Sequence, residues 1–361
     1  MNSTHAAVDL DDVDGLLAAD REGMLRAASM AGAQVRATAA AFDEGEFDAL
    51  KSGQPPRTVI WVAGRGNAES AGTMLSAALG GSVGAPIVVA SEVPPWIGAL
   101  DVLIIAGDDP GDPALVSAAA TGVRRGSRVV VVAPYEGPLR DATAGRSVAL
   151  PPRLWVRDEF GLTRYLAAGL AALQVVDSGL RVDLNALADE LDAEAFRNSA
   201  GRELFTNPAK TLADRMSGCD VVLAGDNAAT LTLARHAASV LLRVAHEAVA
   251  AVGLADAVVA LHAGMGGAVD RERSIFHDEQ IDSPLQRRVR TFVLTTDDER
   301  PVVLARVSGL DNVDVINAED VPEASDVPAA GTAATGRPEQ QLAMLAVRLE
   351  MTAVYLRLVR G

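Results

Sequence analysis

The sequence has few cysteines and no long apolar runs, and each shortage excludes a class of protein. Among the 361 residues there is one cysteine, Cys219, which excludes an internal disulfide and a cysteine-based zinc site. The apolar runs are short or interrupted by charge, and the start MNSTHAAVDLDDVDG lacks the basic and apolar regions of a signal peptide. We therefore expect a cytoplasmic protein without a membrane span.

Basic residues are also scarce. The net charge is −16, with 32 Lys and Arg against 48 Asp and Glu, and no run of arginine is dense enough to form a basic face. Proteins that bind nucleic acid need such a face to neutralise phosphates. We therefore expect no nucleic-acid partner.

What the chain does contain is a repeated alternation of short apolar runs with helical stretches. In the first part, strands are expected at 58–64, 85–91, 101–107 and 127–134, with helices after residue 64 and at 113–124. In the second part, strands are expected at 219–226, 255–264, 290–298, 301–309 and 313–320, with a long helix at 228–252. Buried-type strands separated by helices predict parallel sheets with helices on both faces, an α/β fold.

These patterns divide the chain into four parts. We expect an N-terminal helical segment at 1–44, a first α/β subdomain at 45–150, a helical connector at 151–200 and a second α/β subdomain at 201–361. The second subdomain contains an acidic linker at 319–338 and a closing amphipathic helix at 339–360.

Five stretches resemble segments of one known family, in the same order along the chain. They are DREGML (20–25), GRGNAESAG (64–72), RRGSRVVVVAPYEGPLRDATAG (124–145), NPAKTLA (207–213) and EMTAVYLRL (350–358). Together they are similar to the bifunctional phosphoglucose/phosphomannose isomerases, and to the divergent actinobacterial branch of that family. The resemblance implies the sugar isomerase (SIS) fold, with two tandem, nucleotide-fold-like parallel-sheet subdomains and a C-terminal helix.

The resemblance also implies an activity, the isomerisation of glucose 6-phosphate or mannose 6-phosphate to fructose 6-phosphate without a cofactor. That chemistry needs a phosphate cradle, a glutamate that moves a proton between C1 and C2, a histidine for ring opening and a cation near the enediolate. The expected substrate-binding residues are Gly64, Arg65, Gly66, Asn67 and Ser70 of the first loop, Asp108 of the second loop, and Lys210 of the NPAK motif. Asn67 stands where the family has a serine, and its amide, like the guanidinium of Arg65, can donate to a phosphate.

The second loop, AGDDPGDPAL (106–115), carries aspartates where the family has serine and threonine. An ionised carboxylate only accepts hydrogen bonds, and about 5 Å from a phosphate each unit charge pair costs about 3 kcal/mol at an effective dielectric constant of about 20. Two roles remain open for these aspartates. Asp108 and Asp109 cap the following helix, or Asp108, Asp109 and Asp112 hold a divalent cation against a ligand phosphate. We expect no metal site built from the protein alone.

Three residues are candidates for the catalytic roles. The helix ARHAASVLLRVAHEAVA (234–250) has Arg243 at the family's glutamate position, so its one carboxylate, Glu247, is the candidate base. His262, at the end of an expected strand, is the candidate for ring opening, with His277 as a second choice. Arg153 matches the family's Pro-Arg pair, whereas Arg157 has the better spacing to the following Phe-Gly, so either can supply the cation.

Because the cradle and base motifs are not retained, we expect a catalytically impaired protein of hexose-phosphate and mannose metabolism. It would bind a carbohydrate derivative, a sugar phosphate or nucleotide sugar, or regulate a protein partner in mannose metabolism. The alternative is an active isomerase that uses Glu247, His262 and Arg153. A nicotinamide-dependent enzyme is a third hypothesis, disfavoured by Glu69 at the third glycine position of the GxGxxG pattern. We also expect a homodimer formed through the apolar helices at 160–176 and 339–359.

Overall fold

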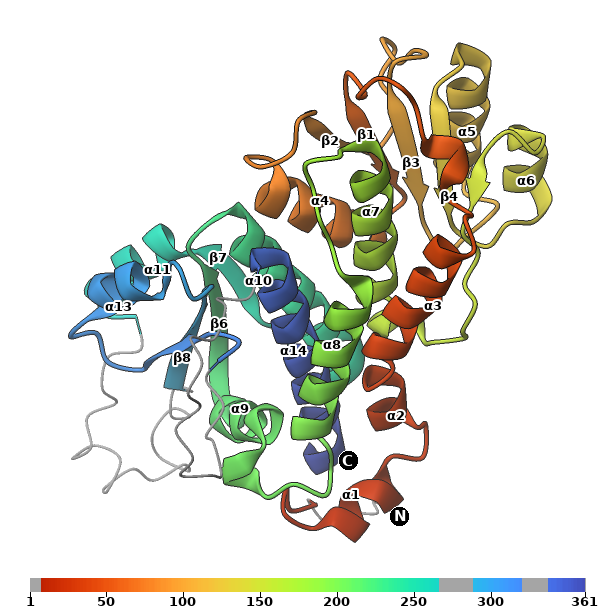
Figure 1. Cartoon of the computed structure of the whole chain (residues 1–361). Helices are drawn as coiled ribbons and strands as arrows, with labels where there is room; N and C mark the ends of the chain where they lie inside the picture. Colours follow the sequence, from red (N-terminus) through yellow and green to blue (C-terminus); the bar gives the residue numbers. More distant parts are fainter. Residues whose placement is uncertain (1–7, 266–287, 320–336, 361) are drawn as a thin grey trace, which may run out of the picture. The chain divides into compact units, whose positions relative to one another are not determined.

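The computed structural model describes residues 8–265, 288–319 and 337–360, which form two compact units (Figure 1). The first unit consists of residues 23–196 and 338–347, and the second unit consists of the described residues among 8–22, 197–337 and 348–360. Residues 320–336 of the expected acidic linker and the second histidine candidate, His277, lie outside the described residues. No helix among the described residues is long and apolar enough to cross a membrane.

The first unit is built on a five-stranded parallel sheet with the strand order β2-β1-β3-β4-β5. Its strands are β1 (Val59–Ala63), β2 (Ile87–Ala90), β3 (Val102–Ala106), β4 (Arg128–Val132) and β5 (Val148–Ala149). The first four lie within the predicted strands. The two-residue strand β5 is not predicted, because so short a segment carries no periodic pattern.

Helices cover both faces of this sheet. The helical elements of the first unit are α2 (Met24–Ala28), α3 (Ala31–Asp43), η1 (Asp48–Leu50), α4 (Asn67–Leu79), α5 (Pro113–Arg125), α6 (Gly137–Thr143), η2 (Asp158–Phe160), α7 (Leu162–Val176) and α8 (Leu184–Arg197). Helix α7 packs against α3 and α4 on one face, and α5 packs against α6 on the other (Figure 1).

Successive side chains of β1 point to opposite faces of the sheet, so this strand contributes to the packing on both. Ile60 and Val62 join the core formed with α5 and α6, whereas Trp61 points to the opposite face. There the indole packs against α4 and α7, and a Cβ atom at Gly72 of α4 would lie 2.4 Å from its Cδ1 atom. Glycine at this position, and at Gly169 of α7, therefore leaves room for the indole ring between the two helices.

The second unit repeats the plan with a four-stranded parallel sheet of order β7-β6-β8-β9. Its strands are β6 (Cys219–Gly225), β7 (Ala250–Gly253), β8 (Arg288–Leu294) and β9 (Val313–Ile316). Its helical elements are α1 (Val13–Ala19), η3 (Leu204–Thr206), α9 (Pro208–Met216), α10 (Ala228–Val240), the π-helical turn η4 (Leu241–Ala245), α11 (Leu254–His262) and α13 (Arg300–Val307). The closing helix α14 (Pro338–Arg360) begins in the first unit and ends in the second.

Three predictions for the second unit are wrong. The helix expected at 228–252 ends at Val240, and its last residues instead form β7, because η4 and the left-handed His246 (φ 57°) turn the chain out of the helix. The strand expected at 255–264 is α11, and the one expected at 301–309 is α13. In α13, Pro301 stands in the first turn, where a missing N–H costs a helix nothing, whereas proline interrupts a strand ladder.

Candidate functional site

The carboxyl ends of the first sheet's strands carry the first glycine loop, between β1 and α4. Gly66 is the N-cap of α4 and has φ 64° and ψ −132°, a conformation that favours glycine. Because the N-cap residue is a glycine, it has no side chain of its own to cap the first turn of α4. Arg65, in the same loop, is exposed. The start of α4 thus has no side-chain cap, and a phosphate cradle at this loop stays a prediction.

The second loop lies against the first. A Cβ atom at Gly64 would be 2.9 Å from Oδ2 of Asp112, so this carboxylate is next to the glycine loop. Its other oxygen, Oδ1, accepts a hydrogen bond from the Ala114 N–H at 2.8 Å and caps α5. Asp109 accepts from the Gly111 N–H at 2.7 Å, and Asp108 is exposed. The cap of α5 is therefore Asp112, a correction to the expected cap at Asp108 and Asp109.

No group of three or more metal-ligating side chains is found among the described residues. The three aspartates of the second loop thus do not form a ready cation site on their own. At the carboxyl ends of the first sheet's strands, they place acceptors rather than donors.

A third segment, around the start of α7, reaches the same edge. The Nδ2 group of Asn67, expected to donate to a phosphate, donates to the backbone oxygen of Asp158. The Tyr165 hydroxyl accepts a hydrogen bond from Nη2 of Arg164 at 2.6 Å. Burial raises the pKa of Tyr165 to about 12; Asp108 and Asp158 add to this rise and Arg164 opposes it. Asn67, one of the expected phosphate donors, is thus already bound to another segment of the chain.

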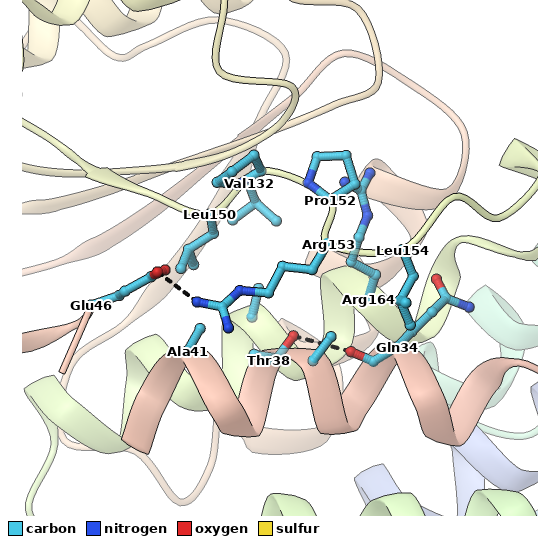
Figure 2. A pocket seen from close by; sticks show the side chains of 13 residues that line it. Gln34, Thr38, Ala41, Glu46, Val132, Leu150, Pro152, Arg153, Leu154 and Arg164 are labelled. Carbon is cyan, nitrogen blue, oxygen red and sulfur yellow. Dashed lines mark hydrogen bonds and ion pairs between the residues drawn. The ribbon is translucent and has the colours of Figure 1, made fainter. Parts of the chain in front are cut away.

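A pocket beside this edge contains Arg153 (Figure 2). It is lined by α3, the end of β4, the loop after β5 and α7, and the space that water could occupy in it is about 30 Å³. That is far smaller than a typical ligand pocket. Arg153 reaches across it, and its guanidinium donates to Glu46 at 2.6 Å (Figure 2). The guanidinium also donates to Glu44 at 3.1 Å. These carboxylates, Glu44 above all, raise the pKa of Arg153, and the pKa of Glu44 is lowered in return.

Arg164 lines the same pocket and is a residue that the sequence analysis missed. Its guanidinium lies 4.4 Å from the centre of the Tyr165 ring. Its Nη1 atom is buried and has no hydrogen-bond partner among the described residues. A buried guanidinium N–H without an acceptor is costly, which marks the position as unusual. No sequence signal distinguishes this arginine from an exposed one in the first turn of a helix.

Ser70, also predicted to bind substrate, lies in α4 of the first unit and is partly buried. Three further predicted site residues lie in the second unit, each beside a different neighbour. Lys210 of α9 is buried; its ammonium donates to the backbone oxygens of Ala200 at 2.8 Å and Arg202 at 2.7 Å, and burial lowers its pKa. Glu247 is partly buried and forms an ion pair with Arg360. It lies beyond α10 and η4 rather than on a long helix, which corrects the expectation.

His262 is the last residue of α11, a helix rather than the expected strand. It is exposed, and its Nδ1 atom lies 2.9 Å from the backbone oxygen of Val258. The three predicted catalytic residues are thus divided, with Arg153 in the first unit and Glu247 and His262 at separate places in the second.

A carboxylate–imidazole pair does occur in the second unit, at residues that the sequence analysis did not combine. Nε2 of His236 in α10 lies 3.0 Å from Oε1 of Glu350 in α14. Their side chains are 1% and 2% exposed, so the pair is closed to solvent and to substrate. Burial raises the pKa of Glu350, and His236 opposes that rise.

Comparison with known proteins places the fold. No protein-family model and no curated protein matches the sequence. Among solved structures, tagatose-6-phosphate ketose/aldose isomerase from Escherichia coli is 14% identical, with a TM-score of 0.62, over 99% of this chain and 96% of that one. A glucose-6-phosphate isomerase-like protein from Thermus thermophilus is 20% identical, with a TM-score of 0.53, over 98% of this chain and 94% of that one.

A third similar structure is the C-terminal domain of glucosamine-fructose-6-phosphate aminotransferase from Francisella tularensis. It is 10% identical, with a TM-score of 0.57, over 96% of each chain. The predicted fold is therefore confirmed: the protein has the SIS fold of the phosphosugar isomerases, with two parallel sheets, helices on both faces and a C-terminal helix. Identities this low establish the fold and not the activity.

Proposed function

We propose that this protein uses the SIS fold to bind a carbohydrate derivative and does not isomerise it efficiently. The ligand class is a sugar phosphate or nucleotide sugar of hexose-phosphate and mannose metabolism. The proposal rests on the ion pairs of Arg153, one of the two candidate cations. Its guanidinium is already bound by Glu44 and Glu46, so its charge is neutralised before any enediolate could form.

Support for binding comes from the glycine loop. Ligands of parallel α/β sheets bind outside the carboxyl ends of the strands, which is where Gly64–Asn67 lies. The uncapped start of α4 and the exposed Arg65 supply positive charge there. Asp108 and Asp112 oppose a phosphate dianion, so we expect weak binding, strengthened when a divalent cation accompanies the ligand.

Support for impaired catalysis also comes from the two candidates in the second unit. Arg360 beside Glu247 stabilises the carboxylate and competes with any proton that the base would take. Nδ1 of His262 is held at the backbone of its own helix. If the protein is instead an active isomerase, Glu247 has to give up its ion pair with Arg360 in order to contact the substrate.

The bifunctional phosphoglucose/phosphomannose isomerases are the family to which we assign this role, on the strength of the five collinear motifs. A regulatory role toward a protein partner in mannose metabolism, in the cytoplasm, belongs to the same proposal. Homodimerisation also remains a prediction, but the two helices expected to form it are covered by the chain itself. Twelve of the fifteen residues of α7 and all of residues 341–356 in α14 are buried, so a dimer would need another surface. Light scattering at the mass of one chain would rule the dimer out.

Isothermal titration tests the proposal. Glucose 6-phosphate, mannose 6-phosphate, fructose 6-phosphate and GDP-mannose would each be titrated with and without Mg²⁺. We expect binding by at least one of them, weakened in Arg65→Gln and unchanged in the matched control Arg146→Gln, which alters an exposed arginine outside the loop. The absence of heat with all four ligands, or binding that ignores Arg65→Gln, would contradict a cradle at this loop.

A further inference from the structure

A larger cavity lies at the opposite edge of the first sheet, where the strands begin. Its walls come from the loop before β1, the start of β4 at Arg128, the loop after α4 and the end of α7. The space that water could occupy in it is about 250 Å³, against about 30 Å³ for the pocket around Arg153. This approaches the lower end of small-ligand pockets, about 300 Å³. Since β1 and β4 are parallel, this cavity and the glycine loop are at opposite ends of the strands.

Two charged side chains line this cavity, and one of them, Asp177, already accepts hydrogen bonds at both of its oxygens. Both oxygens of Asp177 accept backbone hydrogen bonds, from the Gly84 N–H at 2.6 Å and the Gly179 N–H at 2.8 Å. These bonds, with a further one from Leu180, lower the pKa of Asp177. The carboxylate therefore joins two loops through backbone hydrogen bonds, and among the described residues it forms no ion pair with Arg128.

The other charged side chain, Arg128, has no carboxylate partner among the described residues. Its Nη1 atom donates to the backbone oxygen of Leu50 at 2.9 Å, which leaves Nε and Nη2 for another acceptor. Burial lowers the pKa of Arg128, and no neighbouring acid offsets this. A partly desolvated guanidinium facing a cavity is a ready site for an anion.

The rest of the wall is mainly apolar. Val59, Val83, Leu173 and Val176 contribute aliphatic surface, and Pro55 and Pro56 complete it. Such a wall suits the body of a small organic molecule. A phosphate dianion would need more than one cation, and Asp177 would repel it about twice as strongly as it repels a carboxylate monoanion. A planar carboxylate matches the two remaining N–H groups of a single guanidinium.

We propose that this cavity is a second ligand site, which binds a small organic carboxylate with an apolar body. The carboxylate pairs with Arg128, and the body lies against Val59, Val83 and Leu173. The bound molecule joins the start of β1 to the end of α7, and so it stabilises the first unit by mass action. The site is independent of the glycine loop and of any sugar ligand there.

The test uses the full chain and ¹⁹F NMR, with 4-fluorobenzoate as the probe. The neutral 4-fluorobenzamide serves as a matched ligand control, and unlabelled inorganic phosphate serves as a competitor. We expect 4-fluorobenzoate to bind at least about tenfold more tightly than the amide, because a charge-assisted hydrogen bond is lost with the amide. Phosphate should not displace the probe. Equal binding of the two probes, displacement by phosphate, or no binding at millimolar 4-fluorobenzoate would overturn the proposal.

Two variants locate the binding. Arg128→Gln should weaken the affinity for 4-fluorobenzoate at least about tenfold, whereas Arg125→Gln, which alters an exposed arginine of α5, should leave it unchanged. If Arg128→Gln does not fold, Ser178→Trp decides, since Ser178 is exposed at the cavity wall and an indole there would fill the space. Binding that survives in Ser178→Trp would place the probe elsewhere and overturn the proposal.

Discussion

The two sheets share a junction of strand, glycine, asparagine and helix, but they use it differently. Between β6 and α10, Asn227 is the N-cap, and its Oδ1 accepts from the N–H groups of Ala229 at 2.8 Å and Thr230 at 2.9 Å. The Thr230 hydroxyl accepts from the Asn227 N–H at 3.1 Å, which completes a capping box. Asn227 also donates to Glu299, and Asp226 pairs with Arg306.

Between β1 and α4, the asparagine stands one position later relative to the helix start. Gly66 is the N-cap, and Asn67 is already helical, with its side chain turned to the backbone of Asp158. The second junction is thus closed by its own side chains, whereas the first leaves the start of α4 without a side-chain cap. With the asparagine one residue later, its side chain no longer caps the helix that follows.

The largest expected effect comes from adding a methyl group to the glycine after each strand. A Cβ atom at Gly225 would lie 2.2 Å from the backbone nitrogen of Leu231, so α10 would have to move. A Cβ atom at Gly64 would come closest to Oδ2 of the Asp112 side chain, at 2.9 Å, which can shift without moving the backbone but at a cost to its cap on α5. Gly225→Ala should therefore lower the free energy of unfolding by about 3 kcal/mol and Gly64→Ala by about 1 kcal/mol. Urea denaturation of the two variants measures both losses. Equal losses would show that the two junctions are packed equally tightly.

Removing the two asparagine side chains should give the next largest difference. Asn227→Ala removes a helix cap and the bond to Glu299, and should lower the free energy of unfolding by about 2 kcal/mol. Asn67→Ala removes one side-chain hydrogen bond to the backbone and should cost about 0.5–1 kcal/mol. A larger loss for Asn67→Ala in urea denaturation would show that the first junction, too, is held closed by its asparagine.

Charge at the second loop offers a test by ligand binding. Asp108→Asn should strengthen the binding of glucose 6-phosphate or mannose 6-phosphate about tenfold, because one carboxylate no longer repels the phosphate. Asp226→Asn, which removes a carboxylate beside the closed junction of the second sheet, should leave the affinity unchanged. Titration calorimetry measures both affinities. An equal gain in Asp226→Asn would show that the ligand does not bind specifically beside Asp108.

The smallest effect concerns the pH dependence of the Arg153 cluster. The pKa of Glu44 is lowered, chiefly by its hydrogen bond to Arg153. A carboxyl group with a lowered pKa contributes stability above its unfolded pKa, and this contribution is lost as the pH falls through the folded pKa. Arg153→Gln should bring the pKa of Glu44 back toward its ordinary value in an NMR titration. Arg157→Gln serves as the control, and an unchanged Glu44 in Arg153→Gln would show that the two are not paired.

Strands buried on both faces are the part of the fold that the sequence predicts well. The continuous apolar runs of β1, β3 and β4 have nearly every residue buried, so the run itself is the signal. The same signal wrongly predicts strands at α11 and α13. Valines of these helices lie partly on the surface, with Val259 70% and Val302 54% exposed. A short valine-rich segment there has strand composition but not strand burial, and Pro301 is the cue that identifies α13 as a helix.

Only those parts of the candidate site that depend on neighbouring residues in the sequence can be predicted. The glycine loop and its place after β1 follow from the neighbouring residues. The partners that change its chemistry do not, because Arg153 and Glu44 are 109 residues apart and Asn67 and Asp158 are 91 residues apart. Contacts over such separations depend on how α3 and η2 pack, and no local pattern encodes them.

The most direct test of impaired catalysis is exchange of the C2 proton of glucose 6-phosphate and mannose 6-phosphate in D₂O, followed by proton NMR. Exchange reports proton abstraction alone, so it detects a working base even if later steps fail. We expect no exchange above buffer for the wild-type protein. Catalysed exchange that disappears in Glu247→Gln would contradict it and would establish an active isomerase.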